Sequence, residues 1–346
     1  MSSLTILVII IVCIALVFDF LNGFHDAANA IATIVVTRTL TPMQAILLAG
    51  IANFTGYFTF GVAVAKTIGK GVVTIDSVAT PEIKLIILLS ALLGAVVWNI
   101  MTWLLGLPTS SSHALIGGLI GAAVASAGFG VVILGGVIKI VIFIVVAPVI
   151  GMLGASIFTT VIMMLFRKSN PKKMDRHFRR FQIFASLING VGHGTNDAQK
   201  TMGVIALALF AGGITDSFQL QGWIVLSCYC AISLGTVFGG WRIVKTMGTQ
   251  IAKIRPMDGF SSSISSAFVL LGTAHVGIPV STTHVITGSI MGVGAVEHAA
   301  KVRWITARKI VWAWILTIPL TALCAALTYY FLHSFLHRGL YHFFVK

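Results

Sequence analysis

Apolar residues fill long stretches of this chain, and polar residues gather between them. An α-helix needs about 20 apolar residues to cross a bilayer, and several stretches reach or exceed this length. They lack the strict alternation of a transmembrane β-barrel. The pattern predicts membrane helices at 4–21, 43–65, 83–105, 113–128, 131–166, 182–210, 223–241, 260–275, 284–296 and 310–332.

Composition supports this interpretation. Hydrophobic residues make up 57% of the 346 residues and charged residues only 9%, and the mean hydropathy is +1.00. Soluble domains carry roughly 25% charged residues. We therefore predict an all-α, polytopic protein of the cell membrane with about 10–12 transmembrane segments, some of them broken or re-entrant helices. The first stretch follows no basic residue, so it is not predicted to be a removable signal peptide.

Basic residues account for the net charge of +14. They lie between the apolar stretches, which argues against a nucleic-acid partner and for loops held in the cytoplasm. The connector at 167–181 holds seven Lys or Arg residues and one acid, Asp175. It separates a first half at 1–166 from a second half at 182–346. Basic loops near 242–255 and 301–309 are predicted on the same side.

The two halves repeat one another. GFHDAANA (23–30) resembles GTNDAQKT (194–201), and PTSSSH (108–113) resembles PVSTTH (279–284). Both pairs are offset by 171 residues (197 − 26 and 279 − 108). Two motifs with one common offset indicate a duplication, which is typical of secondary transporters.

The repeat is also predicted to be inverted. KTIG (66–69) matches KTMG (245–248), and the basic loops put the first copy outside the cell and the second copy inside. Equivalent loops on opposite sides are the mark of an inverted repeat. Around the two aspartate motifs, the pattern does not distinguish a full span from a re-entrant segment.

Asp26 and Asp197 are the strongest candidates for function. Burying an ionised carboxylate inside a membrane costs free energy, so such a residue normally has a charged or hydrogen-bonding partner or a functional role. Carboxylate oxygens suit Na⁺, a proton or a divalent metal, and we predict that both residues hold a coupling cation. A structural role, as a helix cap or in an ion pair, is the alternative. Asp19 is matched only by Gly190, and its role stays open between a helix end and coupling.

Two hydroxyl clusters follow Pro108 and Pro279 and are typical of helix starts. Capping explains one hydroxyl in each cluster, whereas anion binding explains three, because a helix N-terminus also offers free N–H groups and a positive dipole. The predicted ligands of an oxyanion are Ser110, Ser111, Ser112, Ser281, Thr282 and Thr283.

Other polar residues complete the candidate site. Asn29 and Asn196 are predicted to contact the anion. Lys200 replaces Asn29 in the second copy and is predicted to serve both Asp197 and the anion. The candidates for proton coupling, which adjoin the repeated motifs, are His25, His113 and His284.

Enzyme motifs are missing from the sequence. We find no nucleophile elbow, no Walker-type phosphate loop and no zinc-ligand spacing. The chain is not predicted to be an enzyme, and no cofactor is expected beyond a bound Na⁺ or divalent metal ion. Without an ATP-binding domain, transport would use an ion gradient or the gradient of the substrate.

The motifs resemble those of the inorganic phosphate transporters called the PiT or PHO4 family, which carry a Gly-x-Asn-Asp-x-x-Asn-Ala type signature in each half. The similarity spans about residues 4–333, and His25 with the short connector is similar to the bacterial low-affinity branch. It implies phosphate uptake coupled to H⁺ or Na⁺, alternating access, inverted halves and a homodimer. Several members have an acid where this chain has Asn53 and another near Ser263, and their absence favours H⁺ coupling or carriage of a metal–phosphate complex.

Alternatives remain at this point. The same fold could carry sulfate or a metal–phosphate complex, although a related sulfate branch lacks the aspartate that Asp26 retains. A channel or a non-transporting membrane receptor is the alternative from another functional class.

Overall fold

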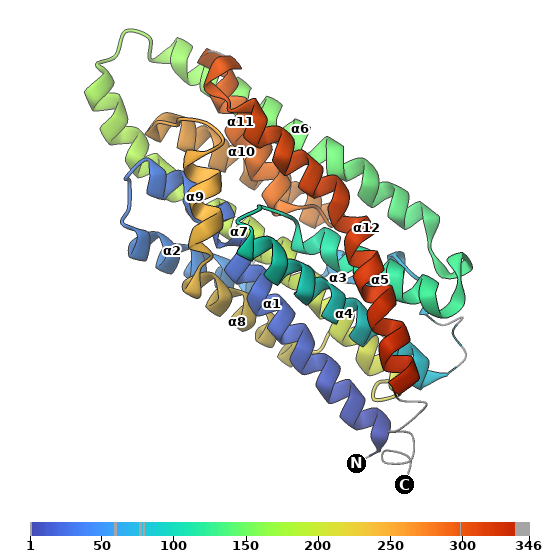
Figure 1. Cartoon of the computed structure of the whole chain (residues 1–346). Coiled ribbons are helices and arrows are strands. Elements are labelled where there is room, and N and C mark those ends of the chain that lie inside the picture. Colours follow the sequence, from blue (N-terminus) through green and yellow to red (C-terminus); the bar gives the residue numbers. More distant parts are fainter. Residues whose placement is uncertain (1, 59–60, 76–77, 79, 298, 336–346) are drawn as a thin grey trace.

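The computed structural model describes residues 2–58, 61–75, 78, 80–297 and 299–335, and the described chain is helical (Figure 1). The first half forms α1 (Ser3–Val36), α2 (Pro42–Thr55), α3 (Ala63–Gly71), α4 (Pro81–Leu104), α5 (Ser111–Ala127) and α6 (Leu134–Leu165). The second half forms α7 (Pro171–Ala211), α8 (Gly222–Phe238), α9 (Trp241–Thr249), α10 (Pro256–Val276), α11 (Thr282–Glu297) and α12 (Trp304–Phe335). The prediction of an all-α membrane protein is confirmed.

Whole and interrupted membrane helices are both present. Among the described residues, α1, α4, α6 and α12 are long and apolar enough to cross a membrane by themselves. The pair α8 and α9 is bent by 71°, and the stretch from α2 to α3 is bent by 83°. The apolar helices α5 and α11 are shorter. The more polar helices are α7 and α10. Helix α7 from Gln182 onward and helix α10 bury most of their polar residues against the protein, which a membrane tolerates.

The same order of helices occurs in both halves. Figure 1 shows α1 and α7 running in opposite directions, and α6 and α12 do the same. Helix α6 packs against α10 and α11, and α12 packs against α4 and α5, so the last helix of each half covers the other half. Equivalent loops also carry the isolated β-bridges Val73–Val132 and Ala252–Val302. Opposite directions are what an inverted repeat requires, while the side of the membrane on which each loop lies stays a prediction.

Glycines allow the short helices to approach their neighbours closely. A side chain on Gly117 of α5 would meet the carbonyl oxygen of Ile318 in α12 at 2.6 Å. In the equivalent place, Gly288 of α11 lies against the backbone of Pro148 in α6. Small residues at such positions let helix backbones touch within a membrane. The glycines therefore fix α5 and α11 against helices of the opposite half.

Helices α1 and α7 run unbroken through the two aspartate motifs. The apolar stretch predicted to end at residue 21 continues to Val36. Alanine is abundant after Asp26 and proline is missing there, so nothing stops the helix. Most of the basic connector also joins a helix, because Asn170 caps α7 by accepting a hydrogen bond from the Lys172 N–H (2.9 Å) and Pro171 occupies its first turn.

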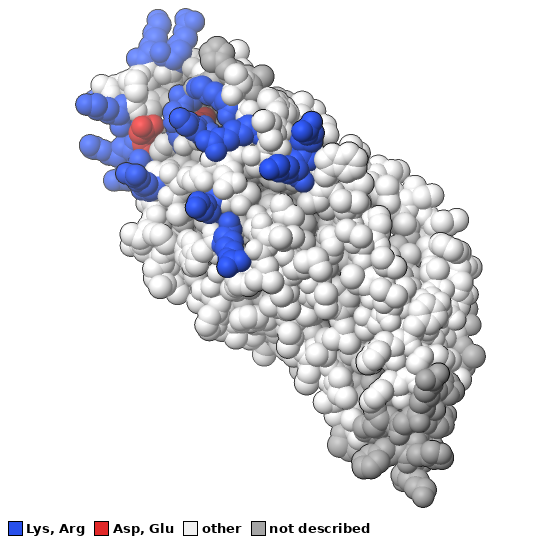
Figure 2. All heavy atoms as spheres, viewed as in Figure 1, with Lys and Arg blue, Asp and Glu red and all other residues white. Residues whose placement is uncertain are grey.

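Basic side chains gather at one end of the molecule. Figure 2 shows Lys and Arg over the part where Figure 1 places the α6–α7 connection, α9 and the start of α12. These are the three basic regions that the sequence assigns to one side of the membrane. The exposed residues in them include Arg167, Lys168, Lys172, Lys173, Arg242, Lys245, Lys253, Arg303, Arg308 and Lys309.

Cysteine labelling tests the topology. Lys172, Lys70 and Lys253 are all exposed, and each would be replaced by cysteine in a chain whose four native cysteines are removed. We expect an impermeant maleimide to label Lys172→Cys and Lys253→Cys only from the cytoplasmic side, and Lys70→Cys only from outside. The cysteine-free chain is the control for background. Labelling of the Lys70 and Lys253 variants from the same side would contradict the inverted repeat, though not the duplication.

Candidate functional site

Two helices begin inside the protein. Ser110 caps α5 by accepting a hydrogen bond from the His113 N–H, and Ser281 accepts one from the His284 N–H at the start of α11, both at 3.2 Å. The prediction of helix starts at the two hydroxyl clusters is therefore confirmed. The prolines, expected in the first turns, instead lie two residues before the capping serines. Both capping residues are buried, so the free N–H groups behind them face the interior of the protein.

The two helix starts meet each other. The rings of His113 and His284 lie 4.7 Å apart, and the Ser112 hydroxyl donates to the Val280 carbonyl at 3.4 Å. The His284 ring also stacks on Trp314 of α12, with 3.8 Å between centroids. Two N-terminal dipoles thus point into one buried region, which favours negative charge there.

Thr282 joins the two aspartates. Its hydroxyl lies 3.2 Å from Asp26 Oδ2 and 3.1 Å from Asp197 Oδ2, and the Thr283 hydroxyl lies 3.2 Å from Asp26 Oδ1. Both aspartates are buried, with exposures of 3% and 0%. A hydroxyl has one proton and donates to one carboxylate at a time. The Thr282 contact therefore leaves one of these carboxylate oxygens in need of another positive partner.

Lys200 is the cationic partner of Asp197. Its Nζ donates to Asp197 Oδ1 at 2.5 Å, to the Val280 carbonyl at 2.9 Å and to the Ser112 hydroxyl. The sequence predicts that Lys200 serves both Asp197 and the anion. The geometry shows its bond to Asp197, and its contact with the anion stays a prediction.

Imidazole rings surround Asp26. His25 Nδ1 lies 3.0 Å from Asp26 Oδ1, and the other ring nitrogen lies 3.3 Å from the Thr102 hydroxyl. His193 Nε2 stands between the two carboxylates, 3.2 Å from Asp197 Oδ2 and 3.9 Å from Asp26 Oδ2. Ligand atoms of Asp26, His193 and Asp197 all lie within 4.8 Å of one another and could hold a metal ion.

Several predicted anion ligands keep polar atoms without partners. Among the described residues, the Ser111 hydroxyl, both amide atoms of Asn196 and Asn29 Oδ1 are buried and form no hydrogen bond. Asn29 Nδ2 donates to the hydroxyls of Thr282 and Thr283 at 3.2 and 3.0 Å. A buried polar group without a partner is costly, so these atoms are available to a ligand. Asp19 is fully buried on α1, and its role stays open.

Sequence reasoning missed part of the site. It does not predict His193 as a site residue, although the offset of 171 aligns it with Asn22 (22 + 171 = 193). It marks Asn53 only as the place of an acid in relatives, and not as the partner of His193, whose Nδ1 lies 3.0 Å from Asn53 Oδ1. Thr102 of α4, which contacts His25, belongs to no repeated motif, and nothing in the sequence marks it.

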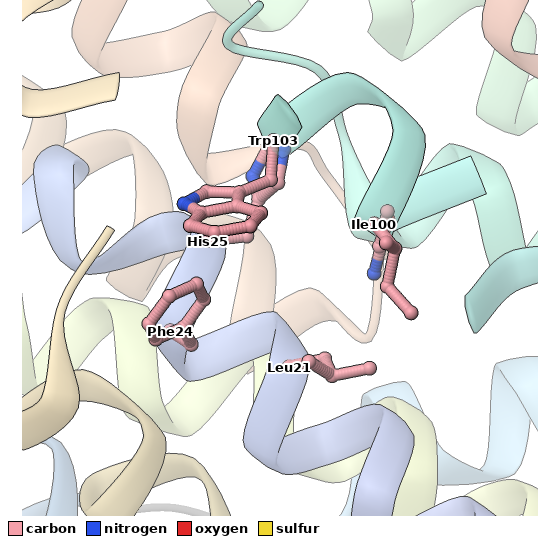
Figure 3. Close-up of a pocket in the computed structure, with 6 residues that line it drawn as sticks. Leu21, Phe24, His25, Ile100 and Trp103 are labelled. Carbon is pink, nitrogen blue, oxygen red and sulfur yellow. The ribbon is translucent and has the colours of Figure 1, made fainter. Parts of the chain in front are cut away.

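A small pocket opens beside His25, away from the carboxylates. Figure 3 shows Leu21 and Phe24 of α1 facing Ile100 and Trp103 of α4 around it. Its lining is completed by His25 and Asn99. The pocket is largely apolar and lacks the carboxylates and hydroxyls of the central site, so we do not include it in that site.

The protein has the helical architecture of a membrane protein, and it buries charged residues where two helix starts meet. Together these features are typical of a membrane transport protein. The phosphate transporter family matches residues 22–325, and the chain belongs to that family. It is thus a multi-pass membrane protein of phosphate transport and not an enzyme.

Known proteins of the same kind cover nearly the whole chain. A protein of Rhizobium meliloti (strain 1021) called "Probable low-affinity inorganic phosphate transporter" is 47% identical over 321 residues, which are 92% of this chain and 95% of the relative. A protein of the same description from Bacillus subtilis (strain 168) is 44% identical and covers 96% of this chain and 99% of its own. A solved structure described as "The sodium-dependent phosphate transporter" has a TM-score of 0.88 and 26% identity, covering 95% of this chain and 99% of its own.

Two neighbouring serines allow capping to be separated from ligand binding. Ser110→Ala removes the cap of α5 and should lower stability by about 1 kcal/mol. Ser111→Ala removes a buried hydroxyl that has no partner, so we expect the melting temperature to stay the same or rise. Melting curves of the purified variants without phosphate measure both effects. Equal destabilisation by the two substitutions would show that Ser111 also has a structural role.

Proposed function

We propose that the chain takes up inorganic phosphate by symport with H⁺ or Na⁺, through alternating access to the central site. Phosphate would bind where the starts of α5 and α11 meet. The observation that carries this proposal is the juxtaposition of two helix N-termini and unpartnered hydroxyl and amide groups with two buried carboxylates. The helix N-termini with the hydroxyl and amide groups attract an oxyanion, whereas the two carboxylates repel it.

Coupling follows from this electrostatic conflict. Phosphate bound near Asp26 and Asp197 would be repelled in a buried, weakly screened environment. A cation at the carboxylates removes that repulsion, so each ligand raises the affinity for the other by the same factor. This reciprocity is the thermodynamic basis that we propose for symport.

The side chains suit more than one cation. Oxygens of Asp26, Asp197 and Thr282 are hard ligands of the kind that Na⁺ takes. His25 and His193 could instead carry protons between the carboxylates and the rest of the site. The sodium dependence named for the related structure supports Na⁺, while the neutral Asn53 beside His193 supports H⁺. We therefore propose either ion.

A metal–phosphate complex is the second candidate substrate. The specific observation is the cluster of Asp26, His193 and Asp197, whose ligand atoms fit around one metal ion. In this case the metal would be part of the cargo. Sulfate remains a rival for the anion site, and the homodimer implied by the family resemblance also remains a proposal.

Transport by purified protein in liposomes distinguishes these cases. Labelled phosphate uptake is measured with a Na⁺ gradient or a pH gradient imposed separately, with sulfate as competitor, and with divalent metals either chelated or supplied. Saturable accumulation driven by one gradient supports symport and identifies its ion. Loss of uptake on chelation supports the metal–phosphate complex. Equilibration without accumulation under every gradient would contradict symport and favour a channel.

The carboxylates are tested by isosteric substitution. Asp26→Asn and Asp197→Asn keep the shape of the side chain but remove its charge, so we expect gradient-driven uptake to fall to the level of empty liposomes. The control is Asp175→Asn, at an exposed position of α7. Normal coupled uptake by either well-folded variant would remove that carboxylate from the coupling site.

The anion site is tested at Ser111. A hydrogen bond to a charged group is worth roughly 1.5–3 kcal/mol, so Ser111→Ala should weaken phosphate binding by about tenfold or more. Equilibrium binding of labelled phosphate to purified protein measures the effect, and the melting temperature of the variant, compared with that of Ser110→Ala, shows whether a capping defect contributes to the loss. Unchanged affinity in the Ser111 variant would remove this hydroxyl from the site.

A further inference from the structure

Lys200 breaks the symmetry of the duplicated site. Each half carries an aspartate three residues earlier, but Asn29 stands at the position equivalent to Lys200 (29 + 171 = 200). Both side chains are buried, with exposures of 3% and 1%. One half therefore contains an ammonium group where the other half contains a neutral amide.

The ammonium is enclosed by oxygen atoms. A lysine has three N–H donors and no acceptor, and Lys200 meets three acceptors: Asp197 Oδ1, the Val280 carbonyl and the Ser112 hydroxyl. A carboxylate, a carbonyl and a hydroxyl are also the oxygen ligands that bind a small hard cation. No N–H of this ammonium is left over for an anion in this arrangement.

The equivalent cluster around Asp26 has a carboxylate and a hydroxyl but no ammonium. Thr283 corresponds to Ser112 and Asp26 to Asp197 at the same offset of 171 residues (283 − 112 and 197 − 26). Thr283 donates to Asp26 Oδ1 at 3.2 Å and accepts a hydrogen bond from Asn29 Nδ2 at 3.0 Å. Asn29 Oδ1 has no partner among the described residues. A carboxylate, a hydroxyl and an amide oxygen thus stand together with no lysine between them.

We propose that Lys200 is a tethered cation that takes the place of an exchangeable ion in the second half. Its ammonium neutralises Asp197 in every transport cycle, so only the first half, at Asp26 and Asn29, binds an exchangeable monovalent cation. This inference rests on the proposed symport. It adds that the two halves contribute unequally and that Lys200 positions Asp197 and Ser112 rather than binding the substrate.

The test converts the second half to the pattern of the first. Lys200→Asn removes the ammonium but supplies an amide oxygen, and we expect the variant to gain a Na⁺ site that the wild type lacks. Without phosphate, NaCl should raise its melting temperature in a saturable way relative to choline chloride at equal ionic strength, and by more than it does in the wild type. In choline chloride, the variant should bind phosphate at least tenfold more weakly than the wild type does. In NaCl, its phosphate affinity should recover.

Two further variants serve as controls. Lys200→Arg keeps the positive charge and should show no additional Na⁺ dependence. Lys200→Met keeps most of the length of the side chain but supplies neither charge nor oxygen, so we expect weak phosphate binding with little recovery in Na⁺. The proposal is overturned if Lys200→Asn resembles the wild type in choline, or if Na⁺ restores neither its stability nor its phosphate binding.

A folding defect also gives an answer. If Lys200→Asn is obtained only when Na⁺ is present, the ion replaces the ammonium and the proposal is supported. If it cannot be obtained even in Na⁺, while Lys200→Asn combined with Asp197→Asn can, then no ion replaces the lysine and the proposal is wrong. The wild type separates this inference from the proposed function, because failure of the wild type to accumulate phosphate under any gradient would refute symport whatever the variants do.

Discussion

Burial of two carboxylates is the constraint on which the rest of the structure depends. Asp26 and Asp197 lie on different helices inside a membrane protein, and neither is tolerated there without partners. Lys200 and His193 lie one turn from Asp197 on the same helix, α7, whereas Thr282 comes from the start of α11. A side chain at a helix start reaches this place only if the helix begins inside the protein. The starts of the short helices α5 and α11 inside the protein bring hydroxyl groups to these buried charges.

The short helices α5 and α11 need support, and long helices of the opposite half supply it. Helices α5 and α11 are shorter than the helices that cross the membrane alone, and each packs against the last helix of the opposite half. Gly117 and Gly288 bring the backbones into contact at equivalent places. Close backbone packing stabilises helices in lipid, where apolar side chains gain little by leaving the lipid tails. The packing that holds the starts of α5 and α11 thus also joins the two halves.

The sequence predicts those features that depend on local pattern. Apolar stretches predict the helices, and the hydroxyl clusters predict the starts of α5 and α11. The common offset of 171 residues between two pairs of motifs indicates the duplication. The sequence does not decide whether α1 continues through Asp26, because Thr282, Thr283 and His193, which help to make this buried carboxylate tolerable, lie on other helices. Contacts of His193 with Asn53 and of His25 with Thr102 join residues 140 and 77 positions apart. No periodicity encodes such distances, so these pairs appear only once the helices are packed.

A duplicated site would bind two equal sets of ligands if its halves were identical. Here the halves differ where charge matters most, since the Lys200 ammonium lies beside Asp197 and the His25 imidazole lies beside Asp26. A charge fixed to the protein cannot leave with the substrate, whereas a bound ion or proton can. In the proposed symport, only the exchangeable charge would link the movement of phosphate to a gradient, because a ligand shifts an equilibrium only through a difference in its binding between states. The proposed tethered charge at Lys200 would therefore reduce the number of ions that accompany each anion.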